Sequence, residues 1–137
     1  EYRLALESKQ ISVHLPPDPI SLQAEPYRLR LILDNLFSNA VSYGAKGGQI
    51  WIRAGQSDNG GWLEVANEGP VIPLDERERI FEPFEQGSIV RQGLLKGSGM
   101  GLSIARESAM SLGGDLRLIE DEQADVCFRL DLKQGAA

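Results

Sequence analysis

The sequence has a single cysteine, a single histidine, and only 14 Lys and Arg residues against 20 Asp and Glu residues. One cysteine excludes an intramolecular disulfide, so a reducing compartment is the simplest expectation. The formal net charge of −6 argues against general nucleic-acid binding, because a phosphate backbone requires a basic surface. No apolar run approaches the roughly 20 residues of a membrane-spanning helix. We therefore expect neither a nucleic-acid partner nor a membrane-embedded segment in this domain.

The composition is typical of one folded globular domain. Of the 137 residues, 42% are hydrophobic and 25% are charged, which supplies enough apolar side chains for a single core. There are no internal repeats and no linker-like stretch inside the chain. Residues 11–137 are therefore predicted to form one domain, preceded by a charged lead-in at residues 1–10 that begins like the end of a helix.

Residue periodicity predicts an α+β fold. Alternating polarity predicts strands at residues 11–15, 20–23, 49–57, 62–66, 115–120 and 124–132. Helices are predicted at residues 26–43 and 100–112, with Pro26 at a first helical position and Gly113-Gly114 after the second helix. The connections include a hairpin turn at 58–61, a short helical turn over 73–80 and a glycine-punctuated loop at 87–99. Antiparallel hairpins with two long helices on one face predict a two-layer α/β sandwich.

The first predicted helix has an apolar side and a polar side. The predicted core stripe is Leu29, Leu33, Leu36, Phe37 and Ala40. Asn35, Asn39 and Ser42 are four and three residues apart, so they share another face. A solvated face favours Lys and Glu, and asparagine is a mediocre helix former, so this stripe is either open surface or one wall of a cleft. In a cleft, an amide oxygen could ligate Mg²⁺ shared with substrate phosphates.

Three further segments each have a structural and a functional interpretation. Residues 65–73 are a strand that runs into a Gly-Pro turn, and residues 79–84 are an aromatic-rich helix end suited to core packing. Residues 96–105 place glycines at alternate positions before a helix, where backbone N–H groups can bind phosphate. The glycines lack the Lys-Ser/Thr ending of a P-loop, so the loop by itself is weak evidence.

Together, in this order and spacing, the four segments resemble the N, G1, F and G2 boxes of the catalytic domain of bacterial sensor histidine kinases. The resemblance covers residues 11–132. It implies a Bergerat-type sandwich, with a mixed and mostly antiparallel sheet, about three helices on one face and a mobile lid over the nucleotide. It also implies ATP and Mg²⁺ as cofactors, and transfer of the γ-phosphate to a histidine in a dimerisation domain. Residues 1–10 would be the end of the linker from that domain.

The resemblance assigns roles to individual residues. Asn39 would coordinate the Mg²⁺ that bridges the phosphates, and Asn35 would contribute from the preceding helical turn. The turn at Asn67 and Gly69 would recognise adenine, next to Tyr43. The other implied nucleotide-site residues are Ile72, Phe81, Phe84, Arg91, Lys96, Gly97, Gly99, Met100, Gly101 and Leu102. Among these, the two phenylalanines would hold the base of the lid and the glycines would wrap the phosphates. Arg91 and Lys96 are the candidate lid cations, with simple solvent exposure as the alternative for Arg91.

The chain departs from the family pattern at three positions. Asn67 replaces the usual adenine-binding aspartate, Val71 replaces a glycine-type residue, and Ser42 replaces a basic residue. These departures leave two functions open, an active phosphotransferase and a degenerate nucleotide-binding or regulatory module. Hydrolysing relatives carry a glutamate one turn before the metal asparagine, where this chain has Asn35. The chain therefore has no obvious general base beside the γ-phosphate to activate water. This absence is compatible with transfer to an imidazole, which is already nucleophilic.

Two side chains of possible chemical interest have structural explanations. His14 lies in a strand pattern and lacks a following acidic residue, so we expect a sheet-edge histidine rather than the phosphoacceptor. Cys127 lies in an alternating run, which favours a core residue over a reactive thiol.

The resemblance further implies a response regulator as the downstream partner and a cytoplasmic position in an inner-membrane sensor protein. The isolated domain is expected to be a monomer that does not autophosphorylate by itself.

Overall fold

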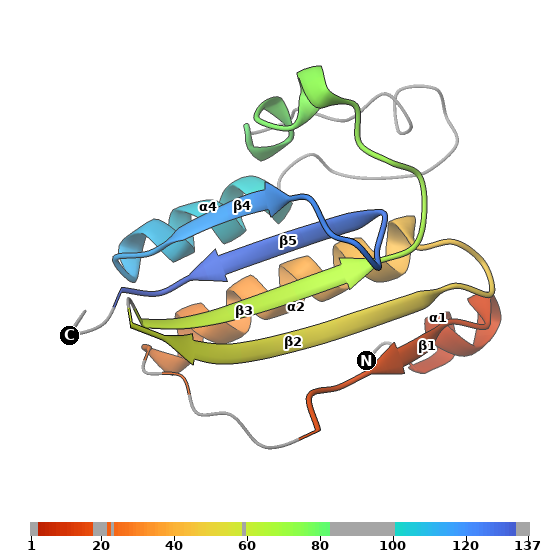
Figure 1. The fold of residues 1–137 in the computed structure, drawn as a ribbon, viewed down its shortest axis with the longest axis horizontal. Coiled ribbons are helices and arrows are strands. Elements are labelled where there is room, and N and C mark those ends of the chain that lie inside the picture. Colours follow the sequence, from red (N-terminus) through yellow and green to blue (C-terminus); the bar gives the residue numbers. More distant parts are fainter. Residues whose placement is uncertain (1–2, 18–21, 23, 59, 83–100, 134–137) are drawn as a thin grey trace.

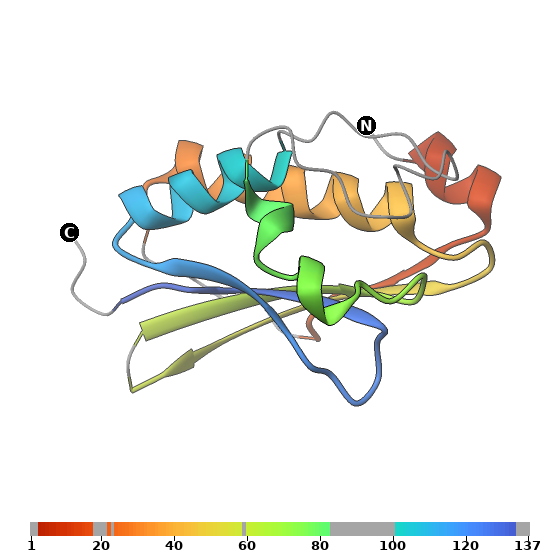
Figure 2. The ribbon, with the colours of Figure 1, turned by 90° about the horizontal axis from the view of Figure 1, so that it is seen from above.

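The computed structural model describes residues 3–17, 22, 24–58, 60–82 and 101–133. These residues form two layers, with a five-stranded sheet on one side and the long helices on the other (Figures 1 and 2). The sheet order is β1-β2-β3-β5-β4. Its strands are β1 (Ser12–His14), β2 (Gln49–Ser57), β3 (Gly60–Asn67), β4 (Asp115–Ile119) and β5 (Val126–Asp131). Only the β1–β2 pair is parallel, so the predicted mixed and mostly antiparallel α+β sandwich is confirmed.

The helical elements lie close to their predicted positions. They are α1 (Arg3–Lys9), α2 (Pro26–Tyr43), the 3₁₀ turns η1 (Leu74–Glu76) and η2 (Arg79–Phe81), and α4 (Gly101–Ser111). No helix among the described residues is long and apolar enough to span a membrane. The hairpin after β2 is tighter than predicted, because Ser57 already pairs with Gly60. Most of the strand predicted at residues 20–23, and the loop predicted at 87–99, lie outside the described residues.

Local chemistry explains where α2 begins and which side it buries. The Glu25 carboxylate accepts hydrogen bonds from the backbone N–H groups of Tyr27 (3.1 Å) and Arg28 (2.8 Å), which satisfies two unpaired donors at the helix start. Pro26 occupies the first turn, where its missing N–H costs nothing. The buried side chains of α2 are Ile32, Leu36, Ala40 and Val41.

The predicted core stripe of α2 was therefore only partly right. Leu36 and Ala40 are buried, whereas Leu29, Leu33 and Phe37 are half-buried at the edge of the core. The difference arises because α2 is covered on two sides, by the sheet and by α4. The buried face of α4 consists of small residues, Ser103, Ala105, Ser108 and Ala109, which lets the two helices approach closely. The helix ends as predicted, with Gly113 at a φ of 78° and its N–H donating to the carbonyl of Met110.

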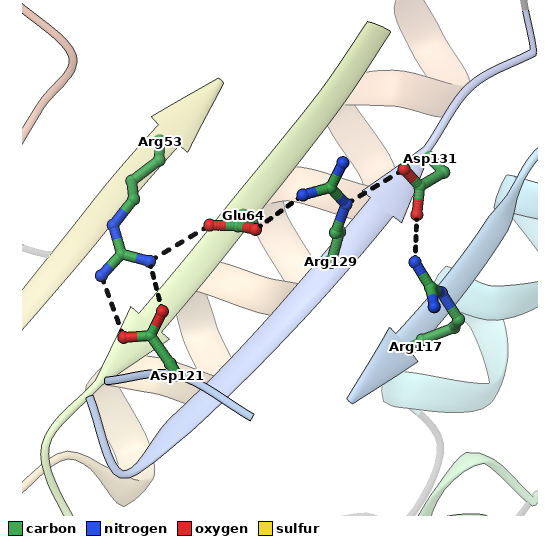
Figure 3. A network of polar contacts seen from close by, with 6 residues as sticks. All are labelled: Arg53, Glu64, Arg117, Asp121, Arg129 and Asp131. Atoms are coloured by element: carbon green, nitrogen blue, oxygen red, sulfur yellow. Dashed lines mark hydrogen bonds and ion pairs between the residues drawn. The ribbon is translucent and has the colours of Figure 1, made fainter. Parts of the chain in front are cut away.

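The face of the sheet away from the helices carries a row of alternating charges (Figure 3). The row, called here the arginine–carboxylate row, consists of Arg53, Asp121, Glu64, Arg129, Asp131 and Arg117. Glu64 is only 7% exposed and accepts from Arg53 at 3.1 Å and from Arg129 at 3.0 Å. Because opposite charges alternate across β2, β3, β5 and β4, this nearly buried carboxylate is fully compensated.

A small apolar cluster lies beside the arginine–carboxylate row, formed by Trp51, Ala66, Ala124 and Cys127. Burial raises the pKa of the Cys127 thiol to about 12, so the thiol is neutral and unreactive at physiological pH. The predicted core role of Cys127 is thus confirmed. His14 lies on the edge strand β1, as expected, where its Nε2 donates to Gln49 Oε1 at 2.7 Å and its ring stacks on Trp51.

Replacing Asp121 with asparagine should destabilise the fold in a pH-dependent way. Asp121 accepts two hydrogen bonds from Arg53 and one each from the backbone N–H groups of Gln123 and Ala124. The guanidinium of Arg53, more than any other group, lowers the pKa of this carboxyl. Asp121→Asn should cost about 1–2 kcal/mol of unfolding free energy at pH 7, measured by denaturant titration.

The pH dependence follows from the sign of the shift. A carboxyl whose folded pKa is lowered stabilises the fold above its unfolded pKa of about 3.9 and loses that contribution as pH falls through the folded pKa. The gap between the wild-type protein and Asp121→Asn should therefore shrink below about pH 4. A gap that stays constant from pH 7 to pH 3 would contradict the proposed role of the charge.

Candidate functional site

The polar side of α2 meets the first residue of α4. Asn35, Asn39 and Tyr43 are half-buried along this side, and Ser42 is exposed. The amide nitrogen of Asn35 donates to the carbonyl of Leu31 at 2.9 Å, which directs the amide oxygen away from the helix backbone. A Cβ atom on Gly101 would lie 3.2 Å from that oxygen, so the first residue of α4 packs directly against the side chain of Asn35. The structure thus brings together Asn35 and Gly101, two residues predicted to serve one site.

The second part of the site is the turn after β3, a strand that runs to Asn67, one residue beyond its predicted end at residue 66. Asn67 is 2% exposed, and its amide nitrogen donates to the carbonyl of Glu68 at 3.1 Å. Asp125 holds the turn from the other side. Its backbone N–H donates to the carbonyl of Asn67, and its carboxylate accepts from the N–H of Gly69 at 3.0 Å. Residues 45–48, 68–70 and Asp125 line a shallow, open hollow beside this turn.

Direct backbone contact joins α2 to this turn. The N–H of Ala45 donates to the carbonyl of Glu68 at 2.8 Å. A Cβ atom on Gly69 would lie only 2.6 Å from the carbonyl oxygen of Tyr43, which is closer than any side chain can pack. Glycine is therefore required at position 69 by this close approach. Tyr43, Asn67 and Gly69, all predicted near one end of the nucleotide, lie together here, and burial raises the pKa of the Tyr43 phenol.

The predicted apolar site residues belong to the core or its edge. Ile72 and Leu102 are half-buried and pack against the core. Phe81 is 5% exposed, meets Phe128 edge to face with ring centroids 5.9 Å apart, and carries the Arg106 guanidinium 4.5 Å above its ring. The core role considered for Phe81 is therefore observed. The predicted residues Phe84, Arg91, Lys96, Gly97, Gly99 and Met100 lie outside the described residues.

The donor set of this site fits a hard cation shared with a phosphorylated ligand. Amide oxygens such as those of Asn35 and Asn39 are hard, neutral ligands, and Mg²⁺ usually combines few protein ligands with substrate phosphates and water. Glu64, Asp121 and Cys127 form the one group of acidic or thiol side chains in the described part of the chain with metal-like spacing. That group is a poor metal site, because Arg53 and Arg129 already bind its carboxylates and its thiol is neutral.

Sequence reasoning missed three residues that organise the site, namely Lys9, Arg106 and Asp125. Lys9 contacts the C-terminal end of α2, Arg106 covers Phe81, and Asp125 holds the turn at Gly69. Each acts on a residue distant in sequence, and each is a charged residue of a kind that is common on surfaces. No periodicity or motif marks such residues.

Comparison with known proteins relates the sequence and the fold of this chain to a family of ATPases. The family model described as "Histidine kinase-, DNA gyrase B-, and HSP90-like ATPase" matches residues 24–135. The sensor histidine kinase GlrK of Escherichia coli (strain K12) is 50% identical over 109 residues, which are 80% of this chain and 23% of GlrK. This chain thus spans about a quarter of that relative's length.

Two solved structures share the fold over almost the whole chain. The nucleotide-free catalytic domain of histidine kinase ThkA superposes with a TM-score of 0.80 at 26% identity, covering 97% of this chain and 85% of that one. Full-length ShkA in complex with AMPPNP superposes with a TM-score of 0.76 at 28% identity, covering 99% of this chain and 28% of ShkA.

Replacing Gly69 with alanine should separate α2 from the turn after β3. The new Cβ must displace the Tyr43 carbonyl, and Gly69→Ala is expected to cost about 1–3 kcal/mol of unfolding free energy, measured by denaturant titration. Gly47→Ala is the matched control. Gly47 has a φ of 75° but no atom within 4 Å of a new Cβ, so only backbone strain of about 1 kcal/mol is expected. Equal losses in the two variants would show that the close approach at Gly69 has no energetic consequence.

Proposed function

Because the chain belongs to the family of histidine kinase-, DNA gyrase B- and HSP90-like ATPases, we propose that it is the catalytic domain of a sensor histidine kinase. In this proposal the domain binds Mg-ATP and donates the γ-phosphate to a histidine of a dimerisation domain, in its own polypeptide or in a dimer mate. GlrK and the Bacillus subtilis protein WalK, two relatives of this chain, are sensor histidine kinases, which supports the kinase rather than the gyrase or chaperone branch of the family.

The observation that carries the proposal is the contact between Asn35 of α2 and Gly101 of α4. It places the amide side chain of Asn35 next to Gly101, the first residue of α4, and Asn39 follows one helical turn later on α2. A helix N-terminus presents unpaired N–H groups and a partial positive charge, which favour phosphate. Amide oxygens on one side and N–H donors on the other are what a Mg²⁺-phosphate group requires.

In the proposed reaction the protein positions groups and stabilises charge. Asn39 would ligate the cation through its amide oxygen, and Asn35 would support it from one helical turn away. Bound Mg²⁺ would neutralise charge on the phosphate oxygens. Position 35 holds an asparagine, so α2 has no carboxylate there to activate water. An incoming imidazole is already nucleophilic and needs no such base. This favours transfer over hydrolysis.

The turn at Asn67 and Gly69 is the proposed adenine subsite. The amide nitrogen of Asn67 is already bound to the carbonyl of Glu68, which leaves the amide oxygen to accept from the adenine amino group. A neutral acceptor is weaker than the aspartate usual in the family, by about 1 kcal/mol. The alternative function is a degenerate nucleotide-binding or regulatory module. It is favoured by this asparagine and by Val71, which is 58% exposed where a glycine-type residue is usual.

The proposal extends to the rest of the parent protein. Residues 1–10 would be the end of the linker from the dimerisation domain, and α1 is the helix in that segment. A response regulator would receive the phosphoryl group, and the domain would lie on the cytoplasmic side of the inner membrane. Sites such as Phe84, Arg91, Lys96, Gly97, Gly99 and Met100 remain proposed nucleotide contacts on the strength of the family pattern alone.

Asn39→Ala should weaken Mg-ATP binding at least about tenfold, since it removes a ligand of the cation and leaves the core intact. Isothermal titration calorimetry of the 137-residue chain measures this directly. Ser42→Ala, on the same side of α2 but exposed, is the matched control and should bind like the wild type. In the parent kinase, Asn39→Ala should abolish phosphotransfer. A folded Asn39→Ala protein with unchanged affinity would refute the cation role, and absence of wild-type binding up to millimolar Mg-ATP would favour the degenerate module.

Asn67→Asp should tighten Mg-ATP binding by about fivefold, because a charged acceptor strengthens the hydrogen bond to the adenine amino group. Desolvation of the new carboxylate would reduce this gain. A purine nucleotide without the amino group should bind the wild type more weakly than ATP and should gain nothing from Asn67→Asp. If removing the amino group changes nothing and Asn67→Ala binds ATP normally, the turn does not read adenine.

A further inference from the structure

The C-terminal end of α2 is capped by a lysine from α1. The Nζ of Lys9 donates to the carbonyls of Val41 at 2.9 Å, Ser42 at 2.8 Å and Gly44 at 3.3 Å. The last carbonyls of a helix lack intrahelical partners and carry partial negative charge, so an ammonium group stabilises them. The last turn of α2 contains no basic residue of its own, so this charge comes from α1. Figures 1 and 2 both show α1 (red) beside this end of α2.

The main chain of α1 is fastened to the same place. The carbonyl of Lys9 accepts from the N–H of Gly47 at 2.7 Å. The next residue, Gln10, has a φ of 56°, a left-handed conformation that a non-glycine residue adopts only where its surroundings impose it. This turn carries the chain directly into β1, where the N–H of Ser12 donates to the carbonyl of Gly48. The segment after α2 therefore holds α1 through both side-chain and backbone hydrogen bonds.

The other side of this segment contacts the turn at Asn67 and Gly69. The carbonyl of Tyr43 lies against Gly69, and the N–H of Ala45 donates to the carbonyl of Glu68. Residues 41–45 thus lie between α1 and the turn proposed to bind adenine. Carbonyls 41, 42 and 44 point to Lys9, whereas the carbonyl of residue 43 lies against Gly69.

We propose that Lys9 is a positioning residue that couples α1 to the adenine end of the nucleotide site. It holds residues 41–45 so that Tyr43 and Ala45 support the turn at Asn67 and Gly69, without touching the nucleotide. The inference rests on the proposed function of ATP binding. Coupling between two sites is reciprocal, so a change in the position of α1 alters nucleotide affinity, and bound nucleotide stabilises the attachment of α1.

The test uses three substitutions in the 137-residue chain. Lys9→Met keeps the aliphatic stem and removes the ammonium group, and Lys9→Arg keeps the charge. Lys133→Met removes the charge of an exposed lysine just after β5, at the opposite end of the sheet from the turn, and is the matched control. Lys9→Gln, which keeps a donor, replaces Lys9→Met if that variant does not fold.

Affinities for Mg-ATP and Mg-ADP are measured by calorimetry. Lys9→Met should weaken both by about the same factor, roughly fivefold, because the coupling reaches the adenine end and not the γ-phosphate. Lys9→Arg should restore binding to within about twofold, and Lys133→Met should leave it unchanged. A plain helix cap predicts lower global stability with unchanged affinities, and that result would overturn the proposal.

Amide hydrogen exchange without nucleotide tests the coupling between α1 and the turn at Asn67 and Gly69 independently of ATP binding. Lys9→Met should accelerate exchange at Ala45 and Gly69 by more than its change in global stability explains, while amides of β5 should follow global stability alone. In the wild type, Mg-ATP should slow exchange at Gln10 and Ile11. If the wild type binds no nucleotide, the proposed function fails, but exchange without nucleotide still tests the coupling. Acceleration confined to α1 in Lys9→Met would overturn the coupling.

Discussion

The carbonyl of Tyr43 lies so close to Gly69 that no side chain fits between the end of α2 and the turn after β3. This contact, with the hydrogen bond from Ala45 to Glu68, fixes the long helix at one end relative to the central strand of the sheet. The position of α2 in turn determines where Asn35 and Asn39 lie, and α4 packs along α2 so that Gly101 meets Asn35. Both proposed subsites, for the base and for the phosphates, therefore depend on one backbone-to-backbone approach that a single methyl group would prevent.

The two faces of the sheet differ in composition and in role. The face toward the helices is apolar, with Ile50, Val65 and Phe128 almost fully buried, and it supports the candidate site. The opposite face holds the arginine–carboxylate row, in which every carboxylate meets an arginine. A buried carboxylate such as Glu64 is costly unless paired, so this face tolerates little change in charge. The helices that carry Asn35 and Gly101 lie on the other side of the sheet from the charged face, whereas the loop that contains Asp121 also contains Asp125, which holds the turn at Gly69.

The sequence predicted the elements because local patterns determine them. Alternation located the strands, and Pro26 and Gly113 marked the beginning of α2 and the end of α4. The burial of Ile32 and Val41 in place of Leu29 and Leu33 was not predictable, because it depends on where α4 packs. The same holds for the contacts of Lys9, Asp125 and Arg106, each of which reaches across the fold. Spacing could mark Asn35 and Gly101 as candidates separately, but only the folded chain brings them into contact.

Cys127, the single cysteine of the chain, lies on the charged face of the sheet under the loop that contains Asp121. Its burial and high pKa mean that a thiol reagent in solution meets neither an accessible sulfur nor a thiolate. Chemical labelling therefore requires a molecule in which the loop over Cys127 has moved away or β5 has separated from its neighbours. The labelling rate under native conditions then counts those rare open molecules, and the protein carries its own probe of opening beside the proposed adenine subsite, because the neighbouring residue Val126 pairs with Asn67.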